Sequence, residues 1–221
     1  MKLHARTAAL AVAWAALCPN PAQAVTLGHA DTFEDGSTQG WGSGANNGLQ
    51  PVVVGGGMLG ADDHYLQVSA SGVHGPGGKL VALAGDAWTG DFISAGVSGV
   101  TMDLINLGST TLSLRLYLLG GPGQSALTQS AVSLPAGSGW THVAFDITPG
   151  ALVGSVLPTL ANVTGLRLYH GPDAIYPGVD VAALLGVDNI TAVPEPGPAA
   201  LLAAGLAVLC LQAPRRRRRA R

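Results

Sequence analysis

A short sequence repeat places arginine and tyrosine side chains where they could meet a ligand. Leu114-Arg115-Leu116-Tyr117 recurs as Leu166-Arg167-Leu168-Tyr169. Alternate side chains of a β-strand point to opposite faces, so each strand would bury its leucines and turn its arginine and tyrosine the other way. Tyrosine rings stack on sugar faces, and arginines donate hydrogen bonds to hydroxyl groups. If both strands lie in one sheet, we expect a carbohydrate-binding surface formed by Arg115, Tyr117, Arg167 and Tyr169, joined by His142.

Two other interpretations of these residues stay open. Alternation of leucine with other residues is common in strands, and exposed arginine and tyrosine are ordinary strand residues, so the repeat is also compatible with a purely structural role. A ligand could instead bind at loop tips, where the sequence places Trp41, Trp88 and Asp91.

Motifs for catalysis are weak in this chain. Residues 25–192 contain a single glutamate, Glu34, so a pair of glutamates for glycoside hydrolysis is missing. The sequence has no Gly-x-Ser-x-Gly nucleophile elbow and no His-x-x-x-His or cysteine-based metal spacing. We therefore predict a binding or structural protein that is not an enzyme, with a glycan-acting hydrolase or lyase as the alternative.

The elements that must position these side chains are predicted to be strands. Leu112, Leu114, Leu116 and Leu118 occupy every second position of one run, and Val143, Phe145 and Ile147 occupy every second position of another. Further β-rich runs cover 51–54, 65–69, 80–83, 100–107, 131–134, 166–170 and 187–192. Clusters of glycine, proline, asparagine and aspartate separate them. About nine strands predict an all-β, antiparallel β-sandwich, in which only 151–160 and 181–185 could hold a helical turn.

Charge and cysteine content narrow the class of protein. Residues 25–192 carry three cations, Lys79, Arg115 and Arg167, against twelve acids, which gives a net charge of −9. This acidity argues against nucleic acid and anionic glycans as partners and favours cations such as calcium. Cys18 and Cys210 lie outside this region, so no disulfide is expected within it. The region has the size of one domain and is large enough to bury a hydrophobic core.

The N-terminus has the features of a signal peptide. Lys2, His4 and Arg6 form a basic segment, residues 7–17 are apolar, and Ala22-Gln23-Ala24 is a typical cleavage site. We predict that signal peptidase removes residues 1–24. A lipid-modified Cys18 is the less favoured alternative, because the residue before a lipidated cysteine is small and here it is a leucine.

The sequence of the C-terminal residues 193–221 predicts a membrane segment. Val193, Pro194, Glu195 and Pro196 form a short motif, residues 198–213 are almost all apolar, and 214–221 are basic. We expect a single transmembrane helix at 198–213, shorter than the ~30 Å hydrocarbon core. The positive-inside rule places the basic tail in the cytoplasm. Its arginine block consists of Arg215, Arg216, Arg217, Arg218 and Arg219. A permanent anchor or a nucleic-acid-binding arm are the alternatives.

This order of motif, apolar run and basic end resembles the PEP-CTERM sorting signal of Gram-negative bacteria. The resemblance implies export, an inner-membrane intermediate, and processing near the motif by a membrane transpeptidase of the exosortase type. It also implies a final location at the cell surface or in the extracellular matrix. Three segments are therefore expected: a signal peptide (1–24), a β-sandwich ectodomain (25–192) and a sorting signal (193–221).

Both ends of the ectodomain resemble a second kind of protein. The segment from Asp31 through Phe33-Glu34 to Trp41, and the closing Gly186-Val187-Asp188-Asn189-Ile190, are similar to the termini of jelly-roll carbohydrate-binding modules and galactose-binding-like domains. The resemblance implies a jelly roll whose first and last strands lie side by side. It also implies a structural calcium held by Glu34 and Asp188, with Asp31 as a weaker ligand. Turn and strand-end roles for these acids are the alternative. Together these features predict a surface or matrix protein associated with extracellular polysaccharide.

Overall fold

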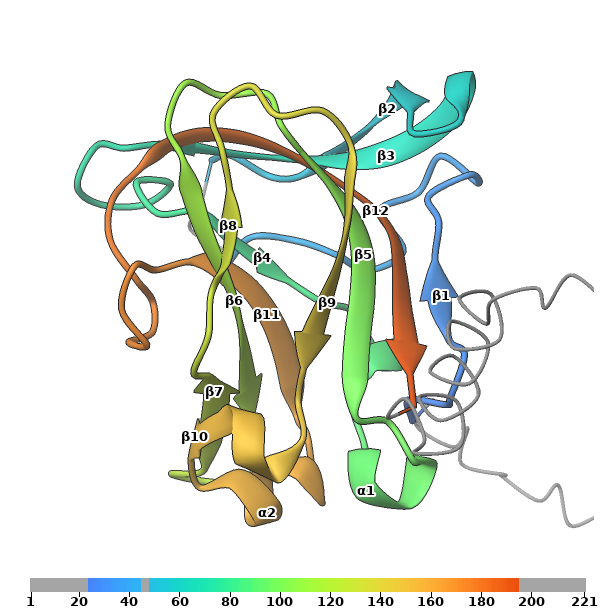
Figure 1. The fold of residues 1–221 in the computed structure, drawn as a ribbon, viewed down its shortest axis with the longest axis vertical. Helices are drawn as coiled ribbons and strands as arrows, with labels where there is room; N and C mark the ends of the chain where they lie inside the picture. The colour runs from blue at the N-terminus through green and yellow to red at the C-terminus, as the bar shows by residue number, and fades with distance from the viewer. Residues whose placement is uncertain (1–23, 45–47, 195–221) are drawn as a thin grey trace, which may run out of the picture.

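A computed structural model describes residues 24–44 and 48–194. They form a sandwich of two antiparallel sheets (Figure 1). The first sheet has the order β2-β3-β12-β5-β9 with β1 paired to β12; its strands are β1 (Ala30–Asp31), β2 (Val52–Gly57), β3 (Gly60–Ser71), β5 (Gly99–Asn106), β9 (Thr141–Asp146) and β12 (Ala182–Val193). The second has the order β10-β7-β6-β11-β4 with β8 paired to β6; its strands are β4 (Val81–Leu83), β6 (Leu112–Leu119), β7 (Ser125–Thr128), β8 (Val132–Leu134), β10 (Leu152–Gly154) and β11 (Gly165–His170). The predicted all-β sandwich is confirmed.

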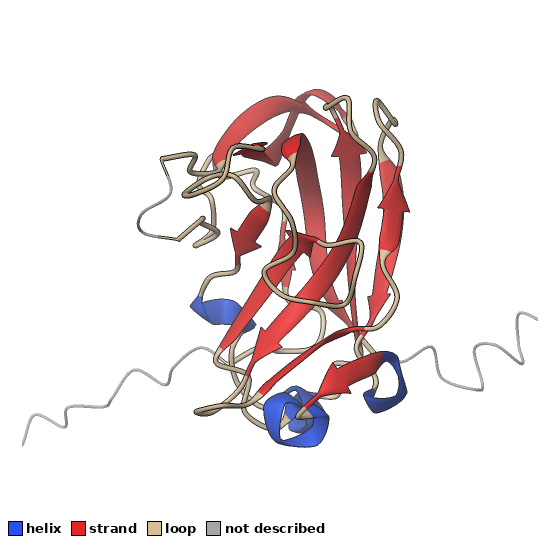
Figure 2. Ribbon diagram, turned by 90° about the vertical axis from the view of Figure 1, so that its left-hand side faces the viewer, coloured by secondary structure: helices blue, strands red, loops and turns tan. Residues whose placement is uncertain are grey.

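Among the described residues, helix is limited to short turns, most of them near one end of the sandwich (Figure 2). These are η1 (Asp86–Trp88), α1 (Phe92–Ala95), η2 (Pro149–Ala151) and α2 (Val156–Leu160). The prediction of a helical turn within 151–160 is confirmed by α2, but the prediction for 181–185 is wrong. Residues from Ala182 onward are the start of β12, where they pair with Ser71 and its neighbours in β3. Hydrogen bonding to an adjacent strand makes this segment a strand, and the local sequence does not indicate that pairing.

The core lies between the sheets, where the predicted alternation places it. Leu112, Leu114, Leu116 and Leu118 of β6 are fully buried, and Leu166 and Leu168 of β11 are buried beside them. On the facing sheet, Val100, Met102 and Leu104 of β5 are buried in the same way. Because side chains alternate along a strand, this packing turns the residues in between outward from the sandwich.

The ends of the described chain meet within the first sheet. β1 pairs with β12, with Ala30 opposite Thr191 and Asp31 opposite Ile190, and Figure 1 shows the two strands side by side. Juxtaposed first and last strands agree with the jelly-roll expectation.

The predicted export signals lie almost entirely outside the described residues. This applies to residues 1–23 of the signal peptide and to Glu195, Pro196, the predicted transmembrane helix 198–213 and the arginine block. Val193 is the last residue of β12, and Pro194 follows it. Within 24–44 and 48–194, no helix has the length and apolar character needed to cross a membrane.

Candidate functional site

The two copies of the Leu-Arg-Leu-Tyr repeat lie next to each other in the second sheet. β6 and β11 are antiparallel, so Arg167 is opposite Tyr117 and Tyr169 is opposite Arg115. All four side chains project from the outer face of the sheet, since the leucines between them fill the core. The antiparallel register places each arginine beside the tyrosine of the other strand.

Arg115 is buried in this arrangement and holds the surrounding backbone together. Its Nε donates to the Gly171 carbonyl at 2.8 Å, and its Nη2 donates to the Pro172 carbonyl at 2.9 Å. Its Nη1 donates to the carbonyls of Thr128, at 2.9 Å, and Gln129. Only 6% of the residue is exposed. These contacts occupy the guanidinium, so Arg115 is a structural residue. It does not form part of the binding surface to which the prediction assigned it.

Tyr169 is also inaccessible. It has 0% exposure, and its ring meets that of Tyr176 edge to face at 5.4 Å. Burial raises the pKa of its hydroxyl above the usual value, which the nearby Arg115 charge only partly offsets. Its Oη has no hydrogen-bond partner within the described part of the chain. Tyr169 therefore supports the surface from beneath.

The accessible part of the face is a cluster of Tyr117, Arg167 and Tyr176, each partly exposed. The rings of Tyr117 and Tyr176 are stacked, with centroids 4.1 Å apart and an interplanar angle of 10°. The Arg167 guanidinium lies 5.1 Å from the Tyr176 centroid and 5.9 Å from that of Tyr117, and its Nη1 donates to Tyr176 Oη. Cation–π contact and this hydrogen bond hold the three side chains in one arrangement. We call them the tyrosine–arginine cluster.

Sequence reasoning missed Tyr176. It lies in the segment between β11 and β12, where no alternating pattern indicates the direction of a side chain. The only local signal is an aromatic residue beside a proline within a turn-rich stretch, Gly171 to Gly178. That signal indicates an exposed loop without saying what the ring contacts.

Two hollows flank the cluster. One, of about 530 Å³, begins at Tyr117 and is lined by the glycine-rich turn after β6 together with Gln124 and Thr164. The other, of about 410 Å³, includes Leu83, which is opposite Arg167 in β4, and continues along Gly42 and Ser43. The cluster thus lies between two open depressions, an arrangement that suits an elongated ligand crossing the strands.

His142 does not join this face. It lies on β9, in the other sheet, and its Nδ1 is 2.7 Å from Asp103 Oδ1. The prediction let it join the tyrosines from the strand after Trp140, but the sequence does not tell which sheet that strand joins.

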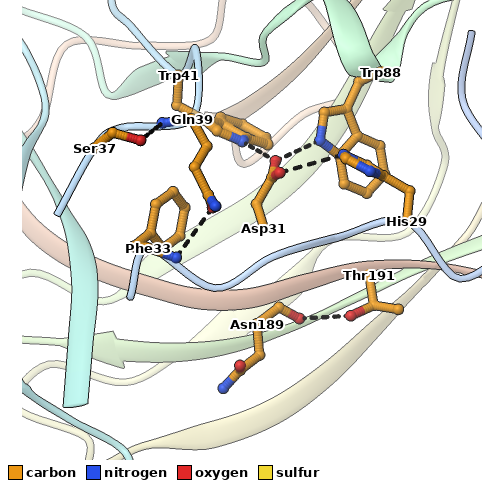
Figure 3. Close-up of polar contacts among 9 residues, drawn as sticks. All are labelled: His29, Asp31, Phe33, Ser37, Gln39, Trp41, Trp88, Asn189 and Thr191. Atoms are coloured by element: carbon orange, nitrogen blue, oxygen red, sulfur yellow. Dashed lines mark hydrogen bonds and ion pairs between the residues drawn. The ribbon is translucent and has the colours of Figure 1, made fainter. Parts of the chain in front are cut away.

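Two of the three predicted loop-tip residues are buried. Trp41 and Trp88 are 3% and 0% exposed, and their indole N–H groups both donate to Asp31 Oδ2, at 2.7 and 2.6 Å (Figure 3). His29 Nε2 lies 3.2 Å from the other oxygen of Asp31. Asp91 is the N-cap residue of α1, where it accepts a hydrogen bond from the Ser94 backbone N–H. The two indoles are therefore core residues that donate hydrogen bonds to a buried carboxylate, and Asp31 Oδ2 is occupied by them.

The remaining calcium candidates, Glu34 and Asp188, differ in environment. Glu34 is exposed and accepts from the His64 backbone N–H at 3.1 Å. Asp188 has 0% exposure; its Oδ1 accepts from the Asn189 backbone N–H, while its Oδ2 has no partner in the described chain. Burial raises the pKa of Asp188 to about 7, and the negative charges of Asp63, Asp103 and Glu34 add to the effect.

An unpartnered, buried carboxylate oxygen in a negative potential suits a cation. Against this, the described residues contain no group of three or more Asp, Glu, His or Cys side chains placed to hold a metal ion. Asp188 and Glu34 thus fit calcium only if carbonyl oxygens or water complete the coordination.

Comparison with known proteins identifies the fold. No protein-family model and no curated protein sequence matches the chain. Among solved structures, it is similar to the family 11 carbohydrate-binding module from Clostridium thermocellum in complex with a β-1,3-1,4-mixed-linked tetrasaccharide, with a TM-score of 0.51 and 12% identity over 76% of this chain and 97% of that one. It is also similar to an exo-β-agarase, with a TM-score of 0.56 and 11% identity over 78% of this chain. The match spans only 25% of the agarase. The described domain therefore has the jelly-roll fold of carbohydrate-binding modules.

Proposed function

We propose that the described domain binds polysaccharide through the tyrosine–arginine cluster on the outer face of its second sheet. The observation that carries this proposal is the stacked pair of Tyr117 and Tyr176, held by Arg167 between two hollows. Both rings of the stack are partly exposed, so a sugar ring can pack against the pair while Arg167 donates hydrogen bonds to hydroxyl groups.

The fold comparison supports the same function. The family 11 module is matched over nearly its full length, and its structure contains a bound β-1,3-1,4-mixed-linked tetrasaccharide. The agarase resemblance covers a quarter of that enzyme, so it does not extend to the whole protein's activity. The contacts found for Tyr117, Arg167 and Tyr176 in the described chain involve no carboxylate. A non-catalytic role is therefore favoured over the hydrolase alternative, because glycoside hydrolysis requires a pair of carboxyl groups.

A glycan array probed with the purified full-length chain tests this function. Tyr176→Ala and Tyr117→Ala should each lose binding, whereas Ile175→Ala, a change at a neighbouring residue that is 67% exposed, should keep it. Binding that persists unchanged in both tyrosine variants contradicts the proposed surface. Release of shortened sugars from the array would instead support the enzymatic alternative.

We further propose that the chain is exported, cut by signal peptidase, held briefly in the inner membrane and processed by an exosortase-type transpeptidase. The support is the sequence order of Val193, Pro194, Glu195 and Pro196, the apolar run 198–213 and the arginine block. The mass of the mature protein from cells tests this. Loss of the residues beyond about Pro196 agrees with processing, and an intact Arg221 contradicts it.

A structural calcium is the last part of the proposal. Asp188 would supply its unpartnered Oδ2 and Glu34 a second carboxylate, while carbonyl oxygens and water would complete the shell. Bound there, the cation would join the turn after β1 to β12 and neutralise a buried charge. Asp31 is left out, because its oxygens face Trp41, Trp88 and His29.

A further inference from the structure

The outer face of the first sheet carries a second group of polar and aromatic side chains. His142 of β9 is opposite Asp103 of β5, and its Nδ1 is 2.7 Å from Asp103 Oδ1. The other Asp103 oxygen accepts from Asn189 Nδ2 at 2.9 Å. Asp103 is 6% exposed, whereas the His142 side chain is 63% exposed. A buried carboxylate thus anchors an exposed imidazole through Nδ1, and Nε2 is left for other partners.

An aromatic pair lies on the same face. Trp140 is two residues before His142, so both side chains project from the same side of the extended chain. The Trp140 ring meets Tyr65 of β3 edge to face, with centroids 5.2 Å apart and an angle of 82°. Tyr65 is only 8% exposed, and Trp140 is partly exposed above it.

Gly186 of β12 makes this pair sterically compatible with the sheet. A Cβ atom at Gly186 would lie 2.9 and 3.0 Å from two carbon atoms of the Tyr65 ring. It would also lie 2.5 Å from Ile105 Cγ2, so a larger residue here would force the Ile105 and Tyr65 side chains to shift. The Tyr65 ring of β3 therefore meets Trp140, which directly precedes β9, across the two strands between them, β12 and β5.

We propose that Trp140 and His142 form a second glycan-binding site, so that one molecule joins two polysaccharide strands from opposite faces of the sandwich. A fixed indole face provides stacking for a sugar ring, and the anchored imidazole hydrogen-bonds to a hydroxyl group through Nε2. The buried carboxylate of Asp103 makes the potential here negative, which selects neutral sugars over anionic ones. The joining of two strands rests on the proposed function of the first face, but the second site does not.

Tryptophan fluorescence tests the second site separately from the first. The tyrosine–arginine cluster contains no tryptophan, and Trp41 and Trp88 are buried, so acrylamide quenching of the described domain reports mainly on Trp140. The experiment uses the full-length Tyr176→Ala protein and a panel of neutral oligosaccharides, including the β-1,3-1,4-linked tetrasaccharide. Subtracting the same measurement on the Tyr176→Ala/Trp140→Phe protein removes the fluorescence of the other tryptophans.

A second site predicts that at least one oligosaccharide protects Trp140 from quenching in the Tyr176→Ala protein. Adding His142→Ala, a change at an exposed residue that the fold should tolerate, should weaken that protection about tenfold. A panel that gives no protection overturns the second site, whatever the first face binds. Protection that is insensitive to His142→Ala overturns the assigned role of the imidazole.

Light scattering with a long neutral polysaccharide tests the joining of strands. The wild-type chain should raise the scattering, and Trp140→Ala and Tyr176→Ala should each abolish the rise while the protein stays bound to the polymer. Scattering that is unchanged in Trp140→Ala contradicts bivalent binding. Scattering lost in Trp140→Ala but kept in Tyr176→Ala would instead contradict the first face and leave the second.

Discussion

Tyr117 and Tyr176 stack with ring centroids 4.1 Å apart, although one projects from β6 and the other from the segment between β11 and β12. The stack holds the Tyr176 ring against a side chain of β6, so a residue outside the strands gains a fixed position relative to the sheet. Arg167 strengthens the pair through its hydrogen bond to Tyr176 Oη and its position over both rings.

Tyr176→Phe separates the stack from the hydrogen bond. Phenylalanine keeps the ring but removes the hydroxyl that accepts from Arg167. We expect glycan affinity to fall by about threefold in Tyr176→Phe and by more than about tenfold in Tyr176→Ala, because an aromatic anchor carries more binding energy than one hydrogen bond. Isothermal titration measures both. Equal losses in the two variants would show that the hydrogen bond, and not the ring, is what the ligand requires.

Arg115→Gln should mainly reduce stability and Arg167→Gln should mainly reduce glycan binding, although both arginines lie in the same Leu-Arg-Leu-Tyr motif. Arg115 donates to four backbone carbonyls, and glutamine cannot satisfy all of them, so we expect a loss of about 3 kcal/mol in the free energy of unfolding. Arg167→Gln should lose less than about 1 kcal/mol and should weaken glycan binding instead. Urea denaturation gives the first quantity and titration the second. Equal destabilisation by the two variants would contradict the different roles given to these arginines.

Asp188→Asn should change how stability depends on pH in metal-free buffer with a chelator. The folded pKa of Asp188 is raised to about 7 from the usual 3.8, chiefly by burial. Between these values the folded protein keeps a proton that the unfolded chain has released, so this residue makes the free energy of unfolding fall as pH rises from about 4 to about 7. The expected fall is on the order of a few kcal/mol and should be missing in Asp188→Asn.

The difference between the two proteins is the quantity to measure, by urea denaturation at a series of pH values. Burial lowers the pKa of His170 below its usual value of 6.5. Below pH 6.5 the unfolded chain therefore binds a proton more readily at this residue than the folded protein does, so His170 makes the free energy of unfolding rise with pH. That contribution is common to both proteins and cancels. A wild-type profile parallel to that of Asp188→Asn would show that the carboxyl is not protonated in the folded state.

Calcium should raise the thermal midpoint of the wild-type chain, and a chelator should lower it. A cation that binds only the native state stabilises it by mass action. Asp188→Asn should abolish the calcium effect. Asp31→Asn serves as the control: it should lower the midpoint by disturbing the Trp41 and Trp88 hydrogen bonds, yet leave the calcium effect intact. If calcium leaves the wild-type midpoint unchanged, Glu34 and Asp188 are not structural ligands.

The amino-acid sequence by itself determined most of the strands and the side chains that fill the core. Leu112 to Leu118 and Val143 to Ile147 alternate with a period of two, and burial of one face of a sheet follows directly from that period. The order of apolar and basic segments at the two ends likewise predicts export from local composition alone. These features depend on neighbours along the chain, which a sequence displays.

The roles of the outward-facing residues were decided only by the tertiary structure. Arg115 and Arg167 occupy the same position in the same four-residue motif, but the segment after β11 closes over Arg115 and offers it backbone carbonyls, while Arg167 receives Tyr176. His142 was predicted to lie beside these residues, but its strand, β9, belongs to the opposite sheet. Exposure depends on which distant segment packs over a side chain, and the hydrogen-bonding and stacking partners that decide this come from parts of the chain that no local pattern connects.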